Sequence, residues 1–266
     1  MATVVDAEAL LIGEKRARTS SHVQPDEATP SIDSLRVEIF ADGADRDAIV
    51  ELAKNPLVKG FTTNPTLMRA AGIRDYDAFA RDVISAVSSM PVCFEVFADD
   101  FDEMYRQALL IAGWGENVYV KIPVTDTQGR SSMPVARRLA LAGAKLNITA
   151  MFTPAQVEEA CAALQGGPSS FLSVFAGRIA DSGRDPVPIM RRCLRIMRDH
   201  PQLRLIWASP REVLNVIQAD EIGCHVITVT HDLLKKLSNV GKPLDQFSLE
   251  TVAMFHRDAT AAGYSL

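Results

Sequence analysis

Eight short apolar runs recur along this chain and are separated by longer amphipathic segments, and this alternation limits the possible folds more than any other feature. The runs are rich in β-branched and aromatic residues, and their lengths are typical of strands that are buried on both faces. They predict strands at Leu35–Phe40, Val58–Thr62, Val92–Val96, Val118–Ile122, Lys145–Thr149, Phe171–Phe175, Leu203–Ala208 and His225–Val229.

The segments between these runs have the spacing of amphipathic helices. They predict helices at Asp45–Lys54, Asp75–Ser88, Phe101–Gly113, Ser131–Ala142, Pro154–Leu164, Pro186–Asp199, Pro210–Ala219, His231–Leu237 and Ser248–Ala261. Three of them begin with a proline, which favours the first turn of a helix. Ser248 is expected to cap the last one.

Eight strands that alternate with helices, at a repeat of roughly 20–35 residues, favour a (β/α)8 TIM barrel over an open doubly wound sheet. No G-x-G-x-x-G follows the first strand, and no G-x-x-x-x-G-K-[ST] occurs in the chain, which weakens the nucleotide-binding alternative. We expect one barrel domain over residues 34–266, with a C-terminal helix. Residues 1–33 are rich in Ser, Thr, Asp, Glu and Pro and predict an arm that is partly ordered or a short helix.

The composition excludes several classes of protein. The chain has 266 residues, 47% hydrophobic, which is ample for a large core, and its net charge of −5 argues against a nucleic-acid or anionic-membrane surface. The four cysteines are scattered without C-x-x-C spacing, which predicts neither disulfides nor a zinc site. No apolar run approaches the ~18 residues of a membrane span, and Ala9–Ile12 is too short for a secretory signal. We therefore expect a cytoplasmic protein.

One lysine, Lys121, lies inside the apolar run Val118–Ile122. Burying an unpaired ammonium costs several kcal/mol, so such a group tends to lose its proton. A neutral lysine amine is a nucleophile that can form a Schiff base with a carbonyl substrate. The alternative is that Lys121 caps the strand and extends its long side chain to solvent.

Polar residues follow or interrupt each of the eight predicted strands, at the end where a barrel gathers its functional groups. They are Asp42, Thr62, Asn64, Glu95, Lys121, Asn147, Thr149, Ser173, Arg178, Ser209, His231 and Asp232. Several have a structural explanation, because Asp42, Ser209 or Asp232 could cap a helix and Asn64-Pro65 could form a turn. Glu95 and Asn147 are harder to explain in this way, since an unpaired polar group in an apolar run costs roughly 1–3 kcal/mol.

Four segments together resemble the transaldolase family, which includes the fructose-6-phosphate aldolases. They are Gly60-Phe61-Thr62-Thr63-Asn64-Pro65, Val118-Tyr119-Val120-Lys121-Ile122-Pro123, Leu146-Asn147-Ile148-Thr149 and Val174-Phe175-Ala176-Gly177-Arg178-Ile179. The resemblance extends from about residue 35 to about residue 235. It implies carbohydrate metabolism of the pentose phosphate pathway, without a metal or an organic cofactor.

The resemblance also implies catalytic roles. Lys121 would form an imine with the carbonyl of a ketose donor, and Asp42 would take the proton from the C4 hydroxyl as the C3–C4 bond breaks. Glu95, together with Thr149, would hold a water molecule that shuttles protons.

Other matched residues would bind the substrate. Asn64 and Asn147 would hydrogen-bond the hydroxyls of the donor, Ser173 would line its pocket, and Arg178 would bind phosphate. The full expected substrate-binding set is Thr62, Asn64, Asn147, Ser173, Phe175, Arg178, Ser209 and Arg211.

Two positions distinguish the subgroups of the family, and one segment departs from its pattern. Fructose-6-phosphate aldolases usually have glutamine in place of Glu95 and tyrosine in place of Phe175, so this chain resembles the transaldolases, which transfer dihydroxyacetone rather than release it. Relatives often have Ala-Ser-Phe and then a basic residue after strand seven. Here Pro210 follows Ser209, and Arg211 could either bind phosphate or lie on the exposed first turn of the next helix.

The sequence thus favours a lysine-dependent transaldolase that moves a dihydroxyacetone unit from a ketose phosphate to an aldose phosphate. The alternative enzyme is an aldolase of the fructose-6-phosphate aldolase type that acts on a related or unphosphorylated sugar. A non-catalytic sugar-binding protein on the same fold is a third reading. Sugar phosphates are the expected partners, and because relatives are commonly dimers, pentamers or decamers, we expect a homo-oligomer. His231 remains a candidate without a partner, and Asp232 is interpreted as a helix start.

Overall fold

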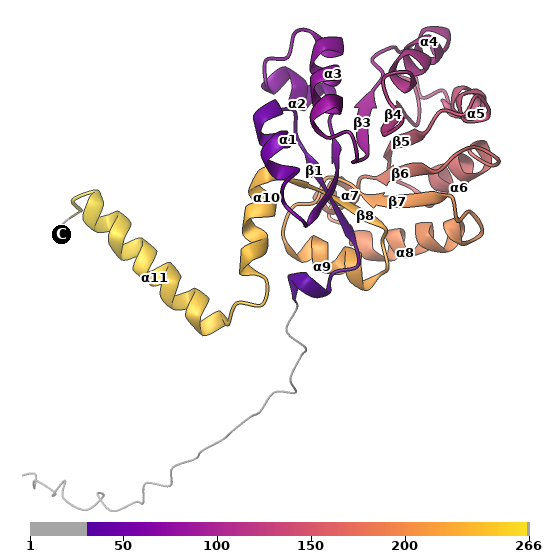
Figure 1. Cartoon of the computed structure of the whole chain (residues 1–266). Coiled ribbons are helices and arrows are strands. Elements are labelled where there is room, and N and C mark those ends of the chain that lie inside the picture. Colours follow the sequence, from indigo (N-terminus) through magenta and orange to yellow (C-terminus); the bar gives the residue numbers. More distant parts are fainter. Residues whose placement is uncertain (1–30, 265–266) are drawn as a thin grey trace, which may run out of the picture.

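A computed structural model describes residues 31–264, and its eight parallel strands form a closed barrel in sequence order (Figure 1). The strands are β1 (Glu38–Asp42), β2 (Val58–Thr62), β3 (Val92–Glu95), β4 (Val118–Pro123), β5 (Leu146–Met151), β6 (Ser170–Val174), β7 (Leu203–Trp207) and β8 (Val226–Thr230). The predicted (β/α)8 barrel is therefore confirmed. The arm predicted over residues 1–33 lies almost wholly outside the described residues.

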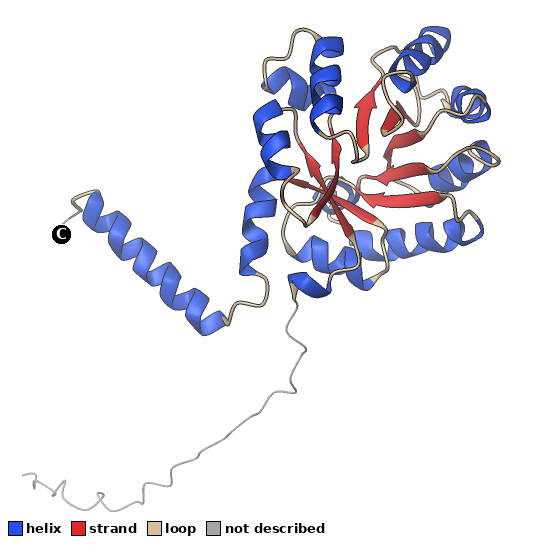
Figure 2. Cartoon of the chain, in the orientation of Figure 1, coloured by secondary structure: helices blue, strands red, loops and turns tan. Residues whose placement is uncertain are grey.

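Helices lie between successive strands and surround the barrel (Figure 2). They are α1 (Arg46–Leu52), α2 (Pro65–Ala70), α3 (Tyr76–Ala86), α4 (Phe101–Ala112), α5 (Met133–Leu141), α6 (Pro154–Ala163), α7 (Ala176–Asp181), α8 (Pro186–Ile196), α9 (Leu214–Glu221), α10 (His231–Lys236) and α11 (Leu244–Ala261). Three 3-10 turns occur at Ile32–Ser34, Met197–Asp199 and Leu237–Asn239. Prolines open α6 and α8 as the sequence predicts, and Thr153 and Asp185 cap these helices.

Strand β1 begins and ends a few residues later in the sequence than the apolar run predicts. The sequence predicts a strand at Leu35–Phe40, whereas β1 spans Glu38–Asp42 and pairs over its full length with β8. The pairing partner therefore sets the strand position, and tertiary hydrogen bonds override the local pattern. As a consequence, Asp42 is the last residue of the strand and not a loop residue after it.

The other differences from the sequence predictions are two additional short helices and shifts of element boundaries by a few residues. Two short helices, α2 and α7, were not predicted, and α9 begins at Leu214 rather than at Pro210. Asn215 explains the late start, since its side-chain oxygen accepts hydrogen bonds from the backbone N–H groups of Arg211 and Glu212 and holds this segment as a turn. Ser248 lies inside α11 and does not cap it.

The amino end of the barrel interior is filled by aromatic side chains. The ring centroids of Phe40 and Phe171 lie 5.4 Å apart, and those of Tyr119 and Phe171 lie 4.4 Å apart. Gly60 makes room for them, because a Cβ at this position would lie 2.7 Å from the Phe40 ring. A separate and larger apolar cluster packs between the strands and the surrounding helices. The interior is thus solid at its amino end, and any cavity must lie towards the carboxyl ends of the strands.

The last helix, α11, extends away from the barrel (Figure 1). It has no buried residue, and several of its apolar side chains, among them Leu244, Leu249 and Phe255, are exposed. None of the helices that the structure describes is long and apolar enough to cross a membrane.

Candidate active site

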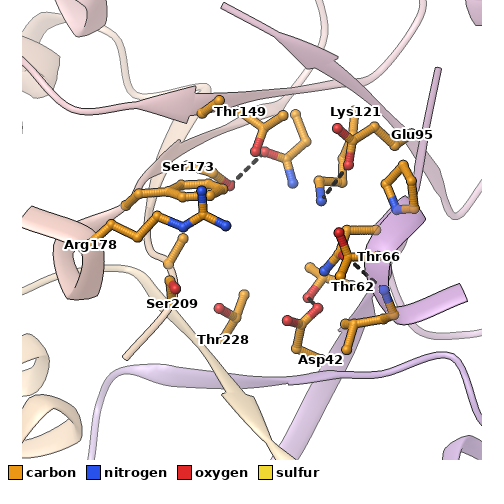
Figure 3. A pocket seen from close by; sticks show the side chains of 17 residues that line it. Asp42, Thr62, Thr66, Glu95, Lys121, Thr149, Ser173, Arg178, Ser209 and Thr228 are labelled. Atoms are coloured by element: carbon orange, nitrogen blue, oxygen red, sulfur yellow. Dashed lines mark hydrogen bonds and ion pairs between the residues drawn. The ribbon is translucent and has the colours of Figure 1, made fainter. Parts of the chain in front are cut away.

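A cavity of about 480 Å³ opens at the carboxyl ends of the strands (Figure 3). Each of the eight strands, or the residue directly after it, contributes to the wall. The lining residues are Asp42, Thr62, Asn64, Pro65, Thr66, Leu67, Glu95, Lys121, Asn147, Thr149, Ala150, Ser173, Phe175, Arg178, Ala208, Ser209 and Thr228. This is the end at which (β/α)8 barrels carry their active sites.

Lys121 points into this cavity and has two close partners. Its Nζ lies 3.0 Å from Oε2 of Glu95 and donates a hydrogen bond of 2.7 Å to the backbone oxygen of Thr63. The side chain is almost completely buried, and the pairing of β3 with β4 places Glu95 directly beside Lys121. The alternative that Lys121 extends to solvent is therefore wrong. The apolar run predicts an unpaired lysine, and this expectation is wrong too, because the register of β3 and β4 supplies the Glu95 carboxylate as a partner.

Asp42 lies on the wall formed by β1 and accepts a hydrogen bond of 2.8 Å from the hydroxyl of Thr62, its paired neighbour on β2. Burial raises the pKa of Asp42 above its ordinary value of 3.8, while Lys121 and the Thr62 hydroxyl oppose that change and Glu95 adds to it. A carboxyl group with a raised pKa can both accept and return a proton, which suits a general acid–base.

Asn147 and Ser173 form a buried network beside the lysine, since Asn147 on β5 pairs with Lys121 on β4. Oδ1 of Asn147 accepts a hydrogen bond of 2.7 Å from the hydroxyl of Ser173, and its amide nitrogen donates to the sulfur of Cys93 at 3.4 Å. These contacts fix the orientation of the amide. Burial raises the pKa of Cys93 to about 11, so this thiol stays protonated and is a poor nucleophile.

Asn64 positions the second loop of the site by capping a helix. Its side-chain oxygen accepts a hydrogen bond of 3.0 Å from the backbone N–H of Leu67, and Pro65 occupies the first turn of α2. The turn that the sequence suggested at Asn64-Pro65 is therefore a helix start. With Oδ1 engaged in the cap, the amide N–H groups of Asn64 are the part of the side chain available to a ligand.

The side of the cavity formed by the ends of β6 and β7 carries a cationic side chain. The guanidinium of Arg178, on α7, lies 5.1 Å from the centre of the Phe175 ring. Ser209, which follows β7, lies near Arg178 on the same side of the cavity in Figure 3. A guanidinium at the edge of the cavity is suited to bind an anionic group of a ligand.

Arg211 is not among the lining residues, although the sequence makes it a candidate for phosphate binding. Its guanidinium forms a forked ion pair with Asp181, and phosphate binding by Arg211 stays a prediction. The alternative, a place on the first turn of the next helix, is wrong, because the exposed Arg211 precedes α9. His231 does not line the cavity either. It is exposed at the start of α10, where Thr230 is the cap and Asp232 lies in the first turn.

Six lining residues were not proposed from the sequence: Pro65, Thr66, Leu67, Ala150, Ala208 and Thr228. Asn followed by proline is a known helix-start signal and could have revealed the first three. Thr228 alternates with the apolar residues of β8, so it could have been found from the inward periodicity of that strand. Ala150 has a φ of 60°, which no sequence pattern indicates for an alanine.

The described residues contain no group of three or more His, Cys, Asp or Glu side chains that could hold a metal ion. Among the described residues that line the cavity, the reactive or polar groups are the Lys121 amine, the carboxyl groups of Asp42 and Glu95, several hydroxyls and amides, and the Arg178 guanidinium. This set defines a barrel site suited to carbonyl chemistry through an amine and acid–base groups.

Comparison with known proteins identifies the family. The sequence pattern of the Transaldolase/Fructose-6-phosphate aldolase family matches residues 39–266. A probable transaldolase of Dehalococcoides mccartyi is 32% identical over 202 residues, which cover 76% of this chain and 90% of the relative. A probable transaldolase of Clostridium acetobutylicum is 33% identical over 215 residues, with 80% and 94% covered. The chain belongs to the transaldolase/fructose-6-phosphate aldolase family, and it is an enzyme of the transferase and aldolase kind.

Solved structures support the fold alone. The 3-hexulose-6-phosphate synthase of Salmonella typhimurium aligns with a TM-score of 0.54 at 16% identity, over 79% of this chain and 99% of that chain. A putative fructose-1,6-biphosphate aldolase of Coccidioides immitis aligns with a TM-score of 0.52 at 13% identity, over 77% and 79%. Both are similar to this chain in fold.

Proposed function

We propose that the protein is a transaldolase that moves a dihydroxyacetone unit from a ketose phosphate to an aldose phosphate through a Schiff base on Lys121. The observation that carries the proposal is the contact of 3.0 Å between the lysine amine and Glu95, inside a cavity that Asp42 also lines. Glu95 can accept the proton that the amine gives up as it attacks a carbonyl, and a neutral amine is a nucleophile.

The first half of the reaction forms the covalent intermediate. The lysine nitrogen attacks the ketone carbon of the donor, its proton passes to Glu95, and the resulting carbinolamine loses water to give an iminium ion. A water held between Glu95 and Thr149 carries protons to and from the oxygen that leaves. Both side chains lie on neighbouring sectors of the same wall, on β3 and β5 with β4 between them.

The second half breaks and remakes a carbon–carbon bond. Asp42 takes the proton of the C4 hydroxyl, and the electrons of the C3–C4 bond move into the iminium, so that an aldehyde leaves and an enamine stays on Lys121. The enamine then adds to an acceptor aldehyde, and Asp42 returns its proton to the new hydroxyl. The raised pKa of Asp42 supports this double role, since the group must hold the proton between the two steps.

The remaining wall residues bind the sugar. Asn147, fixed by Ser173, and the free amide of Asn64 donate hydrogen bonds to hydroxyls of the donor, and Thr62 and Ser209 contribute further hydroxyls. Arg178 binds the phosphate end. We further propose that the enzyme works in the cytoplasm, where its four cysteines, all buried and unlinked, stay reduced.

The second candidate is an aldolase that releases free dihydroxyacetone. Glu95 and Phe175 both line the cavity, and in this family these two positions carry the residues typical of transaldolases, which supports transfer. The test incubates the enzyme with fructose 6-phosphate and isotope-labelled glyceraldehyde 3-phosphate. A transaldolase moves the label into fructose 6-phosphate without accumulating free dihydroxyacetone. Accumulation of dihydroxyacetone at the rate of label exchange would instead establish the aldolase.

A further inference from the structure

Strand β3 loses its neighbour β2 just before it reaches the active site. The last pair between the two strands is Thr62 with Cys93, after which the chain leaves β2 and begins α2. On its other side, β3 stays paired with β4 up to Glu95 and Lys121. The last residue of β3, Glu95, therefore has a neighbouring strand on one side only.

A tyrosine hydroxyl takes the place of β2 at this residue. The hydroxyl of Tyr76 accepts a hydrogen bond of 2.8 Å from the backbone N–H of Glu95 and donates one of 3.0 Å to the backbone oxygen of the same residue. Both backbone groups of Glu95 are thus paired where the strand is missing. Burial raises the pKa of Tyr76 above its ordinary value of 10, so the phenol keeps the proton that it donates.

This replacement of a strand by a side chain also leaves one carbonyl oxygen for Lys121. The ladder between β2 and β3 ends with a hydrogen bond of 3.3 Å from the N–H of Thr63 to the oxygen of Cys93. The next bond of a continued parallel ladder would run from the N–H of Glu95 to the oxygen of Thr63. With Tyr76 bonded to that N–H, the Thr63 oxygen accepts a hydrogen bond of 2.7 Å from Lys121 instead.

Tyr76 is itself held firmly and lies outside the cavity. It is the first residue of α3, which Asp75 caps. The centroid of its ring lies 4.5 Å from that of Phe97 and 5.5 Å from that of Trp114. Tyr76 is not among the lining residues, so it can fix the position of Glu95 without touching a substrate.

We propose that Tyr76 is a positioning residue, whose hydroxyl holds the end of β3 so that the Glu95 carboxylate lies beside the Lys121 amine. By the same contacts it leaves the Thr63 oxygen to this amine. Helix α3 thereby acts on the proton transfers of the reaction through the backbone of β3. This inference rests on the proposed roles of Glu95 and Lys121.

The first test removes the hydroxyl and keeps the ring. Tyr76→Phe should lower kcat for transfer by about tenfold with little change in KM, because it displaces groups beside the reacting atoms and not those that bind the sugar. Free dihydroxyacetone should form a larger share of the product, as in Glu95→Gln. An unchanged kcat in Tyr76→Phe would overturn the inference.

A double-mutant cycle separates positioning from a general loss of stability. If Tyr76 acts through Glu95, adding Tyr76→Phe to Glu95→Gln should lower kcat by no more than about threefold, since the carboxylate that it positions is already gone. A loss by the same factor in both backgrounds would overturn the inference.

Trp114→Phe is the matched control for packing, because it loosens the aromatic contacts of Tyr76 and keeps the Tyr76 hydroxyl. It should lower the midpoint of urea denaturation and leave the share of free dihydroxyacetone unchanged. The same change of product share in Trp114→Phe as in Tyr76→Phe would assign the effect to packing and overturn the inference.

Amide hydrogen exchange tests the contact without turnover. The N–H of Glu95 should exchange slowly in the wild-type protein and at least about tenfold faster in Tyr76→Phe. The N–H of Val96, which donates to the Lys121 oxygen at 3.1 Å on the β4 side, is the internal control and should stay protected.

Fast exchange at Glu95 in the wild-type protein would overturn the inference, even if Tyr76→Phe failed to fold. Absence of an imine after borohydride reduction of the wild-type protein would instead refute the proposed function, and it would not alter the exchange result.

Discussion

The two ends of the barrel interior are built from the same strands but differ in what fills them. At the amino end, Phe40, Tyr119 and Phe171 pack against each other, and the charged pair Arg204–Glu38 is closed at 2.8 Å. At the carboxyl end, the same strands present Asp42, Lys121 and small polar residues around an open cavity.

The difference teaches that charge inside the barrel is not what marks the active site. Both ends contain an acid and a base in contact. Only the carboxyl end combines them with side chains too small to fill the space, so that a substrate can replace solvent next to reactive groups. Matched substitutions at the two ends of one strand test this comparison directly.

The largest effect is expected on β4, where Lys121 and Tyr119 point into the interior two residues apart. Lys121→Met removes the nucleophile and should lower transfer activity by at least about a thousandfold, with an unchanged circular dichroism spectrum. Tyr119→Phe, at the filled end, should keep activity within about twofold, as for residues away from the chemistry. Substantial activity in Lys121→Met would remove the basis of the mechanism.

A smaller loss is expected on β1 for Asp42→Asn, which abolishes proton transfer at C4 and should lower the transfer rate by about 10²–10⁴-fold. The matched change at the amino end, Glu38→Gln, breaks a partly exposed ion pair and should leave the transfer rate nearly unchanged. Steady-state kinetics of both variants decide the comparison. Equal losses of transfer rate in the two variants would mean that any charged group in the barrel interior supports activity, wherever it lies relative to the cavity.

Asp42 also predicts a dependence of stability on pH. Its pKa is raised above 3.8 in the folded state, so the folded protein holds a proton that the unfolded chain has already lost. Asp42 therefore makes folding less favourable as the pH rises from about 4 through its folded pKa. Asp42→Asn should raise the midpoint of urea denaturation at pH 7 and have little effect near pH 3, and a lower midpoint at pH 7 would contradict the burial argument.

Glu95→Gln tests the role of the carboxylate beside Lys121. The change keeps the shape but removes the proton acceptor, so transfer should slow by about tenfold or more, and free dihydroxyacetone should form a larger share of the product. Product analysis by enzymatic assay of dihydroxyacetone measures the share. An unchanged ratio of transfer to release would count against Glu95 as the residue that separates the two activities.

The smallest effect is expected at Ala150, which has a φ of 60° on the cavity wall. Holding an alanine in this left-handed backbone region costs roughly 1–2 kcal/mol. Glycine avoids this strain, but it loses more conformational entropy on folding, which cancels part of the gain. Ala150→Gly should therefore raise the free energy of unfolding by about 0.5–1 kcal/mol. Ala142→Gly, at a φ of −80°, should lower it by a similar amount.

The fold and most of the cavity could be predicted from the sequence for one physical reason. A strand buried on both faces must be apolar throughout, so Glu95, Lys121 and Asn147 were conspicuous, and barrel closure gathers their strand ends. Contacts between elements that are distant in the chain have no comparable signal in the sequence. Asp181 and Arg211 lie 30 residues apart in the chain, and they pair where Gly177 on α7 packs closely against Ser209.

Short helices and local strain also escaped prediction. Asn64-Pro65 is compatible with both a turn and a helix start, and α7 has only six residues with no side-chain cap. Ala150 has a positive φ at the irregularity in the pairing of β5 with β6, and Ser209 has one in the turn after β7. The residue types alanine and serine do not indicate these backbone conformations.

The most direct measurement of the central claim is the mass of the protein after borohydride reduction in the presence of dihydroxyacetone. If Lys121 forms the imine, peptide mapping finds the mass of dihydroxyacetone less one oxygen on the peptide that contains Lys121, and the Lys121→Met variant gains nothing. An unmodified Lys121 peptide at saturating dihydroxyacetone, or the same adduct in Lys121→Met, would contradict the account.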